Sequence, residues 1–270
     1  MANSQRITTH DGGELYTRSW GSGRPVVFVH GWATHSAVWQ YQTSSLLDTA
    51  RCIVYDKRGH GRSSDPGSGY DYDALADDLA TVLEALDVRD AVLVGHSMAP
   101  AEIVRYVRRH GTDRVRSLVL ISSALPFMLR TPDNPEGIDA QAIADRRAAL
   151  LRDVPRFLLQ NARLALLPTV SDETVAWFAR LGECASLPAL VAMNHAITET
   201  DLRADTASIA LPTLVIHGDA DKSAPLPLTG KRVAQMVSGS NLCIYEGAPH
   251  ALLVSHHERL TADLRDWIKR

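Results

Sequence analysis

The sequence predicts an α/β protein built on a mostly parallel β-sheet. Short runs of β-branched and other apolar residues recur along the 270 residues without alternating with polar ones. Such runs are typical of strands buried on both faces of a sheet. Amphipathic helical patterns lie between the runs, and this alternation of strand and helix favours βαβ units. Between residues 124 and 205 the strand pattern stops, which predicts a helical insertion.

The strands are expected in two groups. At the N-terminus, Arg6–Thr9 and Leu15–Trp20 alternate in polarity, and glycines 12 and 13 favour a hairpin turn between them. The buried strands are expected, in chain order, at Val26–His30, Cys52–Tyr55, Ala91–Gly95, Ser117–Ser122, Thr213–Gly218 and Leu242–Tyr245.

Helices are expected both between the strands and in the insertion. In Tyr72–Leu86 the leucines and valines recur on one helical face, and Ala101–His110 shows the same pattern. Further helices are expected near Ala140–Leu151, Val154–Leu166, Asp172–Leu181 and Leu187–Ile197. Residues 1–123 and 206–270 would then form the core, and residues 124–205 a lid over the strand ends where ligands bind in such sheets. A second independent domain is the less favoured alternative, because the strand pattern resumes at residues 211–213.

Composition limits the partners of the chain. Lysine and arginine number 28 against 31 aspartates and glutamates, a formal net charge of −3. This balance argues against nucleic acid or an anionic membrane as a partner, so the expected partner is a small-molecule substrate. Three scattered cysteines without a CxxC pair fit a reducing compartment, so we expect a cytoplasmic location. We see no signal peptide and no membrane-spanning run, and nothing indicates an oligomeric state.

A candidate nucleophile follows the third buried strand. The strand ends in Gly95-His96-Ser97-Met98-Ala99 and leads directly into a helix. A serine on such a sharp turn is exposed at the top of the sheet, and small residues two positions away on either side let the backbone pass close by. The alternative is a Gly-Ser turn without chemistry.

A candidate acid and base follow later strands. Asp219 and Asp221 come after the strand Thr213–Gly218, and His250 comes after the last strand. Since parallel strands end at one edge, these groups can meet Ser97 there, and a serine needs a base to become a good nucleophile. Spacing does not choose between the two aspartates. Other histidines, among them His30, His96, His217, His256 and His257, are expected in packing or loop hydrogen bonds, and no spacing indicates a metal site.

An oxyanion hole would complete the site. One donor is expected from the backbone N–H of Met98, the residue after the serine, and the other from the backbone N–H of Trp32, after the first buried strand. The indole of Trp32 would line the substrate pocket together with Phe127 and Met128. Phe157 and Trp177 are further candidates for the pocket, although packing of the lid explains them equally well.

Several segments together resemble the α/β-hydrolase fold, and within it the bacterial aryl esterases and cofactor-free (non-haem) haloperoxidases, or perhydrolases. The matching segments are VVFVHGWATHSAVWQYQ, YDKRGHGRSSDP, DYDALADDLATVLEALD, VLVGHSMAPAEIVRYVRRHG, LPTLVIHGDADKSAP and YEGAPHALLVSHHERLTADLRDWI. The resemblance implies an eight-stranded, mostly parallel sheet flanked by helices. It implies catalysis by Ser97, Asp221 and His250, without a cofactor, with Trp32 and Met98 as backbone oxyanion donors. It also implies that Asp56 and Arg58 brace loops.

The sequence departs from this family at Ala99-Pro100, where two glycines are usual. Proline is tolerated in a first helical turn, but it disfavours helical backbone at the preceding residue. Either Ala99 is strained, or the helix begins later.

The predicted function is therefore a serine hydrolase that cleaves carboxylic esters through an acyl-enzyme, with perhydrolase activity if hydrogen peroxide replaces water. Lactones, thioesters or carbon–carbon bonds are alternative substrates for the same triad. A catalytically impaired, ligand-binding hydrolase fold is the alternative of another class. No G-x-G-x-x-G motif follows a strand, so a dinucleotide site is not expected.

Overall fold

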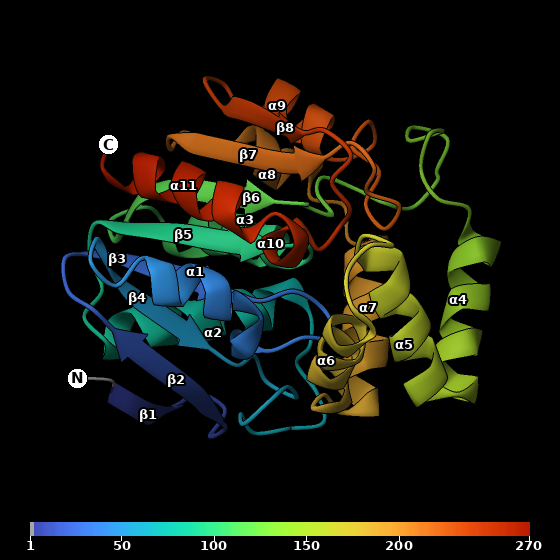
Figure 1. Ribbon diagram of the computed structural model, residues 1–270, viewed down its shortest axis with the longest axis horizontal. Coiled ribbons are helices and arrows are strands. Elements are labelled where there is room, and N and C mark those ends of the chain that lie inside the picture. The colour runs from blue at the N-terminus through green and yellow to red at the C-terminus, as the bar shows by residue number, and fades with distance from the viewer. Residues whose placement is uncertain (1–2) are drawn as a thin grey trace.

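The computed structural model describes residues 3–270 and contains one eight-stranded sheet with helices on both faces (Figure 1). The strands are β1 (Asn3–Thr8), β2 (Glu14–Trp20), β3 (Arg24–Val29), β4 (Ala50–Tyr55), β5 (Ala91–His96), β6 (Val115–Ile121), β7 (Thr213–Gly218) and β8 (Asn241–Tyr245). Their order is β1-β2-β4-β3-β5-β6-β7-β8. The first two strands form the expected antiparallel hairpin, and β3 to β8 are parallel to one another. The predicted fold class is confirmed.

The central strands are apolar at every position because both of their faces are covered. In β3, Val27 and Val29 belong to the core on one face of the sheet, together with Leu79 of a neighbouring helix. Val26 and Phe28 point to the core on the opposite face. Successive side chains of a strand leave on opposite sides, so a strand between two helical layers needs no polar position.

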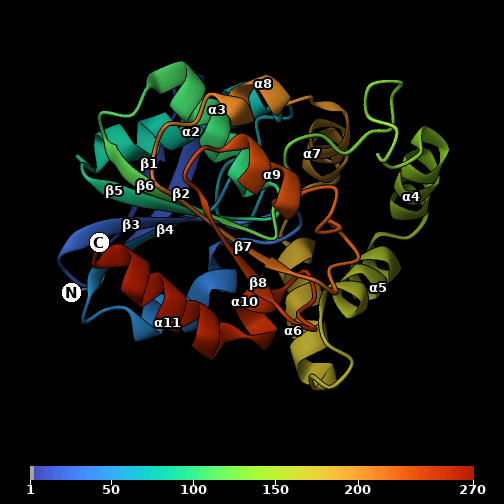
Figure 2. The same ribbon diagram turned by 90° about the horizontal axis from the view of Figure 1, so that it is seen from above.

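Two helical layers cover the sheet (Figure 2). One face carries α2 (Tyr72–Ala85), α3 (Ala99–His110), α8 (Arg203–Ala207) and α9 (Gly230–Met236), and the other α1 (Gln40–Ser45), α10 (Leu252–Ser255) and α11 (His257–Ile268). A 3-10 turn, η1 (Ser36–Trp39), precedes α1. The helices α2 and α3 were expected, whereas α1, α8, α9, α10 and α11 were not.

The segment between β6 and β7 contains five helices and no strand, and the last of them is α8 on the face of the sheet. The other four form the insertion and lie close to the predicted ranges: α4 (Ala140–Arg152), α5 (Val154–Ala165), α6 (Asp172–Glu183) and α7 (Leu187–Glu199). The side chains that cap their N-termini by accepting backbone N–H groups are Asp139, Asp153, Ser171 and Ser186. The four helices gather beyond the carboxyl ends of the parallel strands, opposite the chain termini (Figure 1). None of the helices in residues 3–270 has the length and apolarity needed to cross a membrane.

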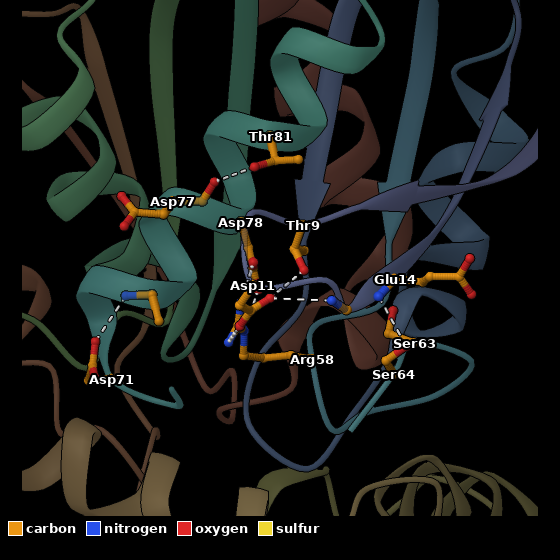
Figure 3. A network of polar contacts seen from close by, with 12 residues as sticks. Thr9, Asp11, Glu14, Arg58, Ser63, Ser64, Asp71, Asp77, Asp78 and Thr81 are labelled. Carbon is orange, nitrogen blue, oxygen red and sulfur yellow. Dashed lines mark hydrogen bonds and ion pairs between the residues drawn. The ribbon is translucent and has the colours of Figure 1, made fainter. Parts of the chain in front are cut away.

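Arg58, in the loop after β4, ties three elements together (Figure 3). Its guanidinium donates to both carboxylate oxygens of Asp78 on α2, at 2.7 and 2.6 Å, and to Asp11 in the hairpin turn at 2.8 Å. Asp56 accepts the backbone N–H groups of Ser36 and Arg62, each at 2.9 Å. Both residues therefore brace loops, as the resemblance implies.

Replacing Arg58 by methionine should lower the free energy of unfolding by about 3–5 kcal/mol, because the nearly buried Asp78 carboxylate would lose its counter-charge. Urea unfolding followed by circular dichroism measures this change. The matched control is Arg89→Met, which breaks only an exposed pair with Asp87 and should change stability by less than about 0.5 kcal/mol. Equal effects of the two substitutions would contradict the bracing role.

His60 should make stability depend on pH. Burial lowers its pKa from 6.5 to about 4, so the folded chain keeps it neutral where the unfolded chain protonates it. Its contribution is therefore complete above pH 6.5 and is lost as the pH falls toward 4. Between pH 7.5 and pH 5 the wild type should lose about 2 kcal/mol more than His60→Asn. Identical pH profiles for the two proteins would refute this.

Candidate active site

The strand β5 delivers Ser97 to the site on a strained turn. Ser97 has a φ of +63°, which is costly for a residue with a side chain. Neighbouring backbone holds it there, since its N–H donates to Ile121 at 3.0 Å and its carbonyl accepts from Ala124 at 2.9 Å. Glycine is required beside it: a Cβ on Gly95 would lie 2.7 Å from Ile103, and one on Gly31 would lie 2.9 Å from the Cβ of Ser97.

The Ala99-Pro100 departure fits into the first turn of α3. The helix begins at Ala99, two residues before the predicted start, and Pro100 lies within its first turn. Both residues are buried, and Ala99 has no positive φ. Of the two alternatives, the later start is wrong, because the helix already includes Ala99, the residue before the proline.

Three side chains from three loops form one hydrogen-bonded chain. The Ser97 Oγ lies 2.9 Å from Nε2 of His250, and Nδ1 of His250 lies 2.7 Å from Oδ2 of Asp221. With the Nδ1 proton donated to Asp221, Nε2 is free to accept the hydroxyl proton of Ser97. Asp219 is exposed and accepts the backbone N–H of Gly247 at 2.7 Å. The structure therefore brings Asp221, not Asp219, to the imidazole.

Asp221 is held as a carboxylate by three hydrogen-bond donors. Its Oδ1 accepts the backbone N–H groups of Ser223 and Ala224, each at 2.8 Å. Its Oδ2 accepts from Nδ1 of His250, and Nε2 of the buried His217 lies 3.3 Å from the same oxygen. Burial alone would raise the pKa of Asp221, but the charge of His250 and the contacts with both histidines outweigh it and hold the pKa well below its usual value. The group stays ionised and fixes the imidazole.

The other histidines near the site serve the surrounding backbone, as expected. His217 donates from Nε2 to the carbonyl of Ala224 at 2.8 Å, and His96 donates from Nε2 to the carbonyl of His250 at 3.0 Å. Burial and the charge of His250 lower the pKa of His96 to about 3, so this ring is neutral. His30 bonds the Lys57 amide at 2.9 Å. These contacts position the loops that carry the three chemical groups.

Two backbone amides remain available beside the serine. Within residues 3–270, neither the N–H of Trp32 nor that of Met98 donates to a protein acceptor. Met98 is fully buried at the start of α3, next to Ser97. The indole of Trp32 is fixed separately, because its Nε1 donates to the carbonyl of Leu190 on α7 at 2.8 Å.

A cavity of about 400 Å³ opens above Ser97, between the sheet edge and the four inserted helices. Of the residues expected in the substrate pocket, Trp32 and Met128 line it. Phe127 is buried outside it, with the Arg203 guanidinium 5.3 Å from its ring centroid, so the structure does not bring Phe127 to the cavity. Phe157 packs edge-on against Trp32, and Trp177 packs against Tyr41, in line with the packing interpretation.

Sequence reasoning missed several polar residues of this cavity. They are Arg146 of α4, Asn161 of α5, Asn194 and Thr198 of α7, and Lys222 and Ser223 of the loop after β7. In the sequence, a charged or amide side chain on a helix is indistinguishable from one on a solvated face. Only the packing of the insertion shows which side chains meet the cavity. Among residues 3–270, no group of three or more His, Cys, Asp or Glu has the arrangement of a metal site.

Comparison with known proteins gives one consistent relationship. Residues 24–257 match the alpha/beta hydrolase fold family. The chain is 36% identical to a non-heme chloroperoxidase from Kitasatospora aureofaciens, covering 97% of this chain and 98% of that one. It is 34% identical to a bifunctional esterase/perhydrolase from Acinetobacter calcoaceticus, covering 97% and 99%. Among solved structures, a bromoperoxidase from Bacillus anthracis superposes with a TM-score of 0.96 at 30% identity, covering 99% and 100%.

Proposed function

We propose that this chain, which belongs to the α/β-hydrolase fold family, is a serine hydrolase that cleaves carboxylic esters through an acyl-enzyme. One observation carries the proposal: the hydrogen-bonded chain from Asp221 through His250 to Ser97 ends at the cavity that Ser97 and His250 line. The esterase and perhydrolase activities named for the relative from Acinetobacter calcoaceticus use the same acyl-transfer chemistry.

The first half of the reaction forms the acyl-enzyme. Ser97 Oγ attacks the ester carbonyl carbon while His250 Nε2 takes the hydroxyl proton, and Asp221 stabilises the imidazolium that results. The carbonyl oxygen becomes an oxyanion, which the free amides of Trp32 and Met98 would stabilise. When the tetrahedral intermediate collapses, the bond to the alcohol oxygen breaks and His250 gives its proton to the leaving alcohol.

The second half repeats these steps with a small acceptor. His250 takes a proton from water, the hydroxide attacks the acyl carbon, and the acid leaves Ser97, which recovers its proton. If hydrogen peroxide replaces water, the same steps release a peracid, which oxidises halide in solution. The bifunctional esterase/perhydrolase relative supports this second outcome. No step requires a group beyond the residues named.

We propose that residues 124–205 act as a lid on a core made of residues 1–123 and 206–270. The support is positional, since all four of the helices α4 to α7 contribute side chains to the cavity above Ser97. A lid excludes water and strengthens the electrostatic interactions beneath it. We also propose a cytoplasmic location for the protein, on the basis of its three scattered cysteines.

Wild-type protein should release the chromophore of a short-chain aryl ester with an initial burst equal to the enzyme concentration. Ser97→Ala should lower kcat by a factor on the order of a million, because the nucleophile is lost. Stopped-flow absorbance measures both quantities. Ser44→Ala, at an exposed position on α1, is the matched control and should keep full activity. If neither protein turns over any ester, lactone or thioester, the ligand-binding alternative replaces the proposal.

Asp221→Asn should lower kcat by about ten-thousand-fold with little change in fold, because an amide no longer fixes the productive tautomer of His250. Asp219→Asn, in the same loop, is the matched control. It should retain activity within a few-fold. Steady-state kinetics with circular dichroism separates loss of catalysis from unfolding. A larger loss in the Asp219 variant would show that Asp219, not Asp221, is the acid.

A further inference from the structure

The cavity wall that residues 3–270 form contains positively charged side chains but no carboxylate. Arg146 of α4 and Lys222 of the loop after β7 both line the cavity that contains Ser97. Among the described residues, no aspartate or glutamate lines it. Two positive charges therefore face the substrate space without a negative charge in its wall.

Neither cation is neutralised by the protein. Within residues 3–270, Arg146 and Lys222 form no ion pair. The guanidinium of Arg146 donates to the side-chain oxygen of Asn161 and lies 5.4 Å from the ring centroid of Phe157. The adjacent Arg147 differs, since it pairs with Glu199 at 2.6 Å. Although Arg146 as a residue is exposed, the surrounding protein lowers the pKa of its guanidinium by desolvation. An unpaired, partly desolvated guanidinium gains most from an anion that it can bind with two hydrogen bonds.

Two asparagines give the same wall additional donors. The side-chain oxygen of Asn161 accepts from Arg146, and that of Asn194 accepts from Arg147 Nε at 2.8 Å. Each carbonyl oxygen accepts from an arginine, and the Nδ2 group of each amide is a donor that can serve a ligand. Positive charge combined with N–H donors suits a carboxylate, which only accepts hydrogen bonds.

The rest of the wall is apolar. The aliphatic and aromatic side chains there include Met128, Ile138, Ile143, Phe178 and Ile197. Such a surface fits a short hydrocarbon segment better than a second polar group. A substrate with an ester at one end, a hydrocarbon spacer, and an anion at the other end would match all three parts of the cavity.

We propose that the enzyme selects esters that carry a carboxylate separated by a short hydrocarbon segment from the bond that is cleaved, and that Arg146 is the main residue recognising this carboxylate. Lys222 adds long-range attraction, and Asn161 and Asn194 add hydrogen bonds. The inference rests on the proposed ester hydrolysis and names the substrate class for that same site.

Two matched pairs of substrates test the proposal. For a carboxylate on the acyl side, the monomethyl ester of adipic acid is compared with the methyl ester of its monoamide, which is neutral and nearly the same shape. For a carboxylate on the alcohol side, 4-acetoxybenzoate is compared with 4-acetoxybenzamide. The measured quantity is the ratio of kcat/KM between the acid and the amide of each pair, at low and high salt. We expect a ratio of about 10 to 100 in one pair, carried mainly by KM and reduced by salt.

Variants connect the ratio to the residue. Arg146→Gln should bring the ratio close to one, Arg146→Lys should retain part of it, and Lys222→Gln should reduce it by a few-fold. Arg152→Gln removes the same charge from the same helix at an exposed position outside the cavity and should leave the ratio unchanged. Circular dichroism and thermal unfolding confirm that each variant is folded.

The outcomes separate this inference from the proposed function. Equal rates for acid and amide in both pairs, or a ratio that Arg146→Gln does not alter, would overturn the carboxylate preference and leave ester hydrolysis standing. An equal effect of Arg152→Gln would also overturn it, because general surface charge would then explain the preference. Failure to hydrolyse any ester would overturn both.

Discussion

The proposed function depends on the hydrogen-bonded chain that joins Asp221, His250 and Ser97. Its two contacts, at 2.7 and 2.9 Å, join residues that are up to 153 positions apart in the sequence. The parallel sheet makes this possible, because β5, β7 and β8 end at the same edge. Two groups of contacts hold these side chains in place. Backbone N–H groups donate to Asp221, and His96 donates to the backbone carbonyl of His250.

The conformational strain of this arrangement lies in the backbone around Ser97. Ser97 adopts a positive φ because the chain must reverse from strand to helix within two residues while leaving the hydroxyl exposed to the cavity. Gly31 and Gly95 provide the space for that reversal, and each would clash with a neighbour if it carried a side chain. The helix then accepts Ala99 and Pro100, so extra bulk beside the nucleophile is compatible with the turn.

Much of the fold and the chemical groups of the site could be predicted from the sequence, because short-range patterns determine them. The buried strands are continuous apolar runs, and the residues after them carry the serine, acid and base. Spacing alone did not show which of Asp219 and Asp221 is the acid. In the structure Asp219 accepts the backbone N–H of Gly247 and Asp221 that of Ser223, and these long-range and loop contacts are not visible in the sequence. Helix α11 was missed although its buried Leu260 and Leu264 are four residues apart, a helical spacing.

The substrate side of the cavity was less predictable, because it depends on how the inserted helices pack. Phe127 was expected in the pocket but is buried outside it, and Arg146, for which no role was expected, lines the cavity. The first outcome depends on the path of the loop between β6 and α4, and the second on how α4 packs over the sheet edge. Local sequence periodicity contains no information about either, so the substrate class could be inferred only from the assembled structure.

If His250 activates Ser97, this serine alone should react rapidly with a serine-directed fluorophosphonate. Peptide mapping in a mass spectrometer then locates the label. We expect one label per chain, located on Ser97, and loss of rapid labelling in His250→Gln while the protein stays folded. A label on a different serine, or equal labelling rates in the wild type and in His250→Gln, would contradict this activation.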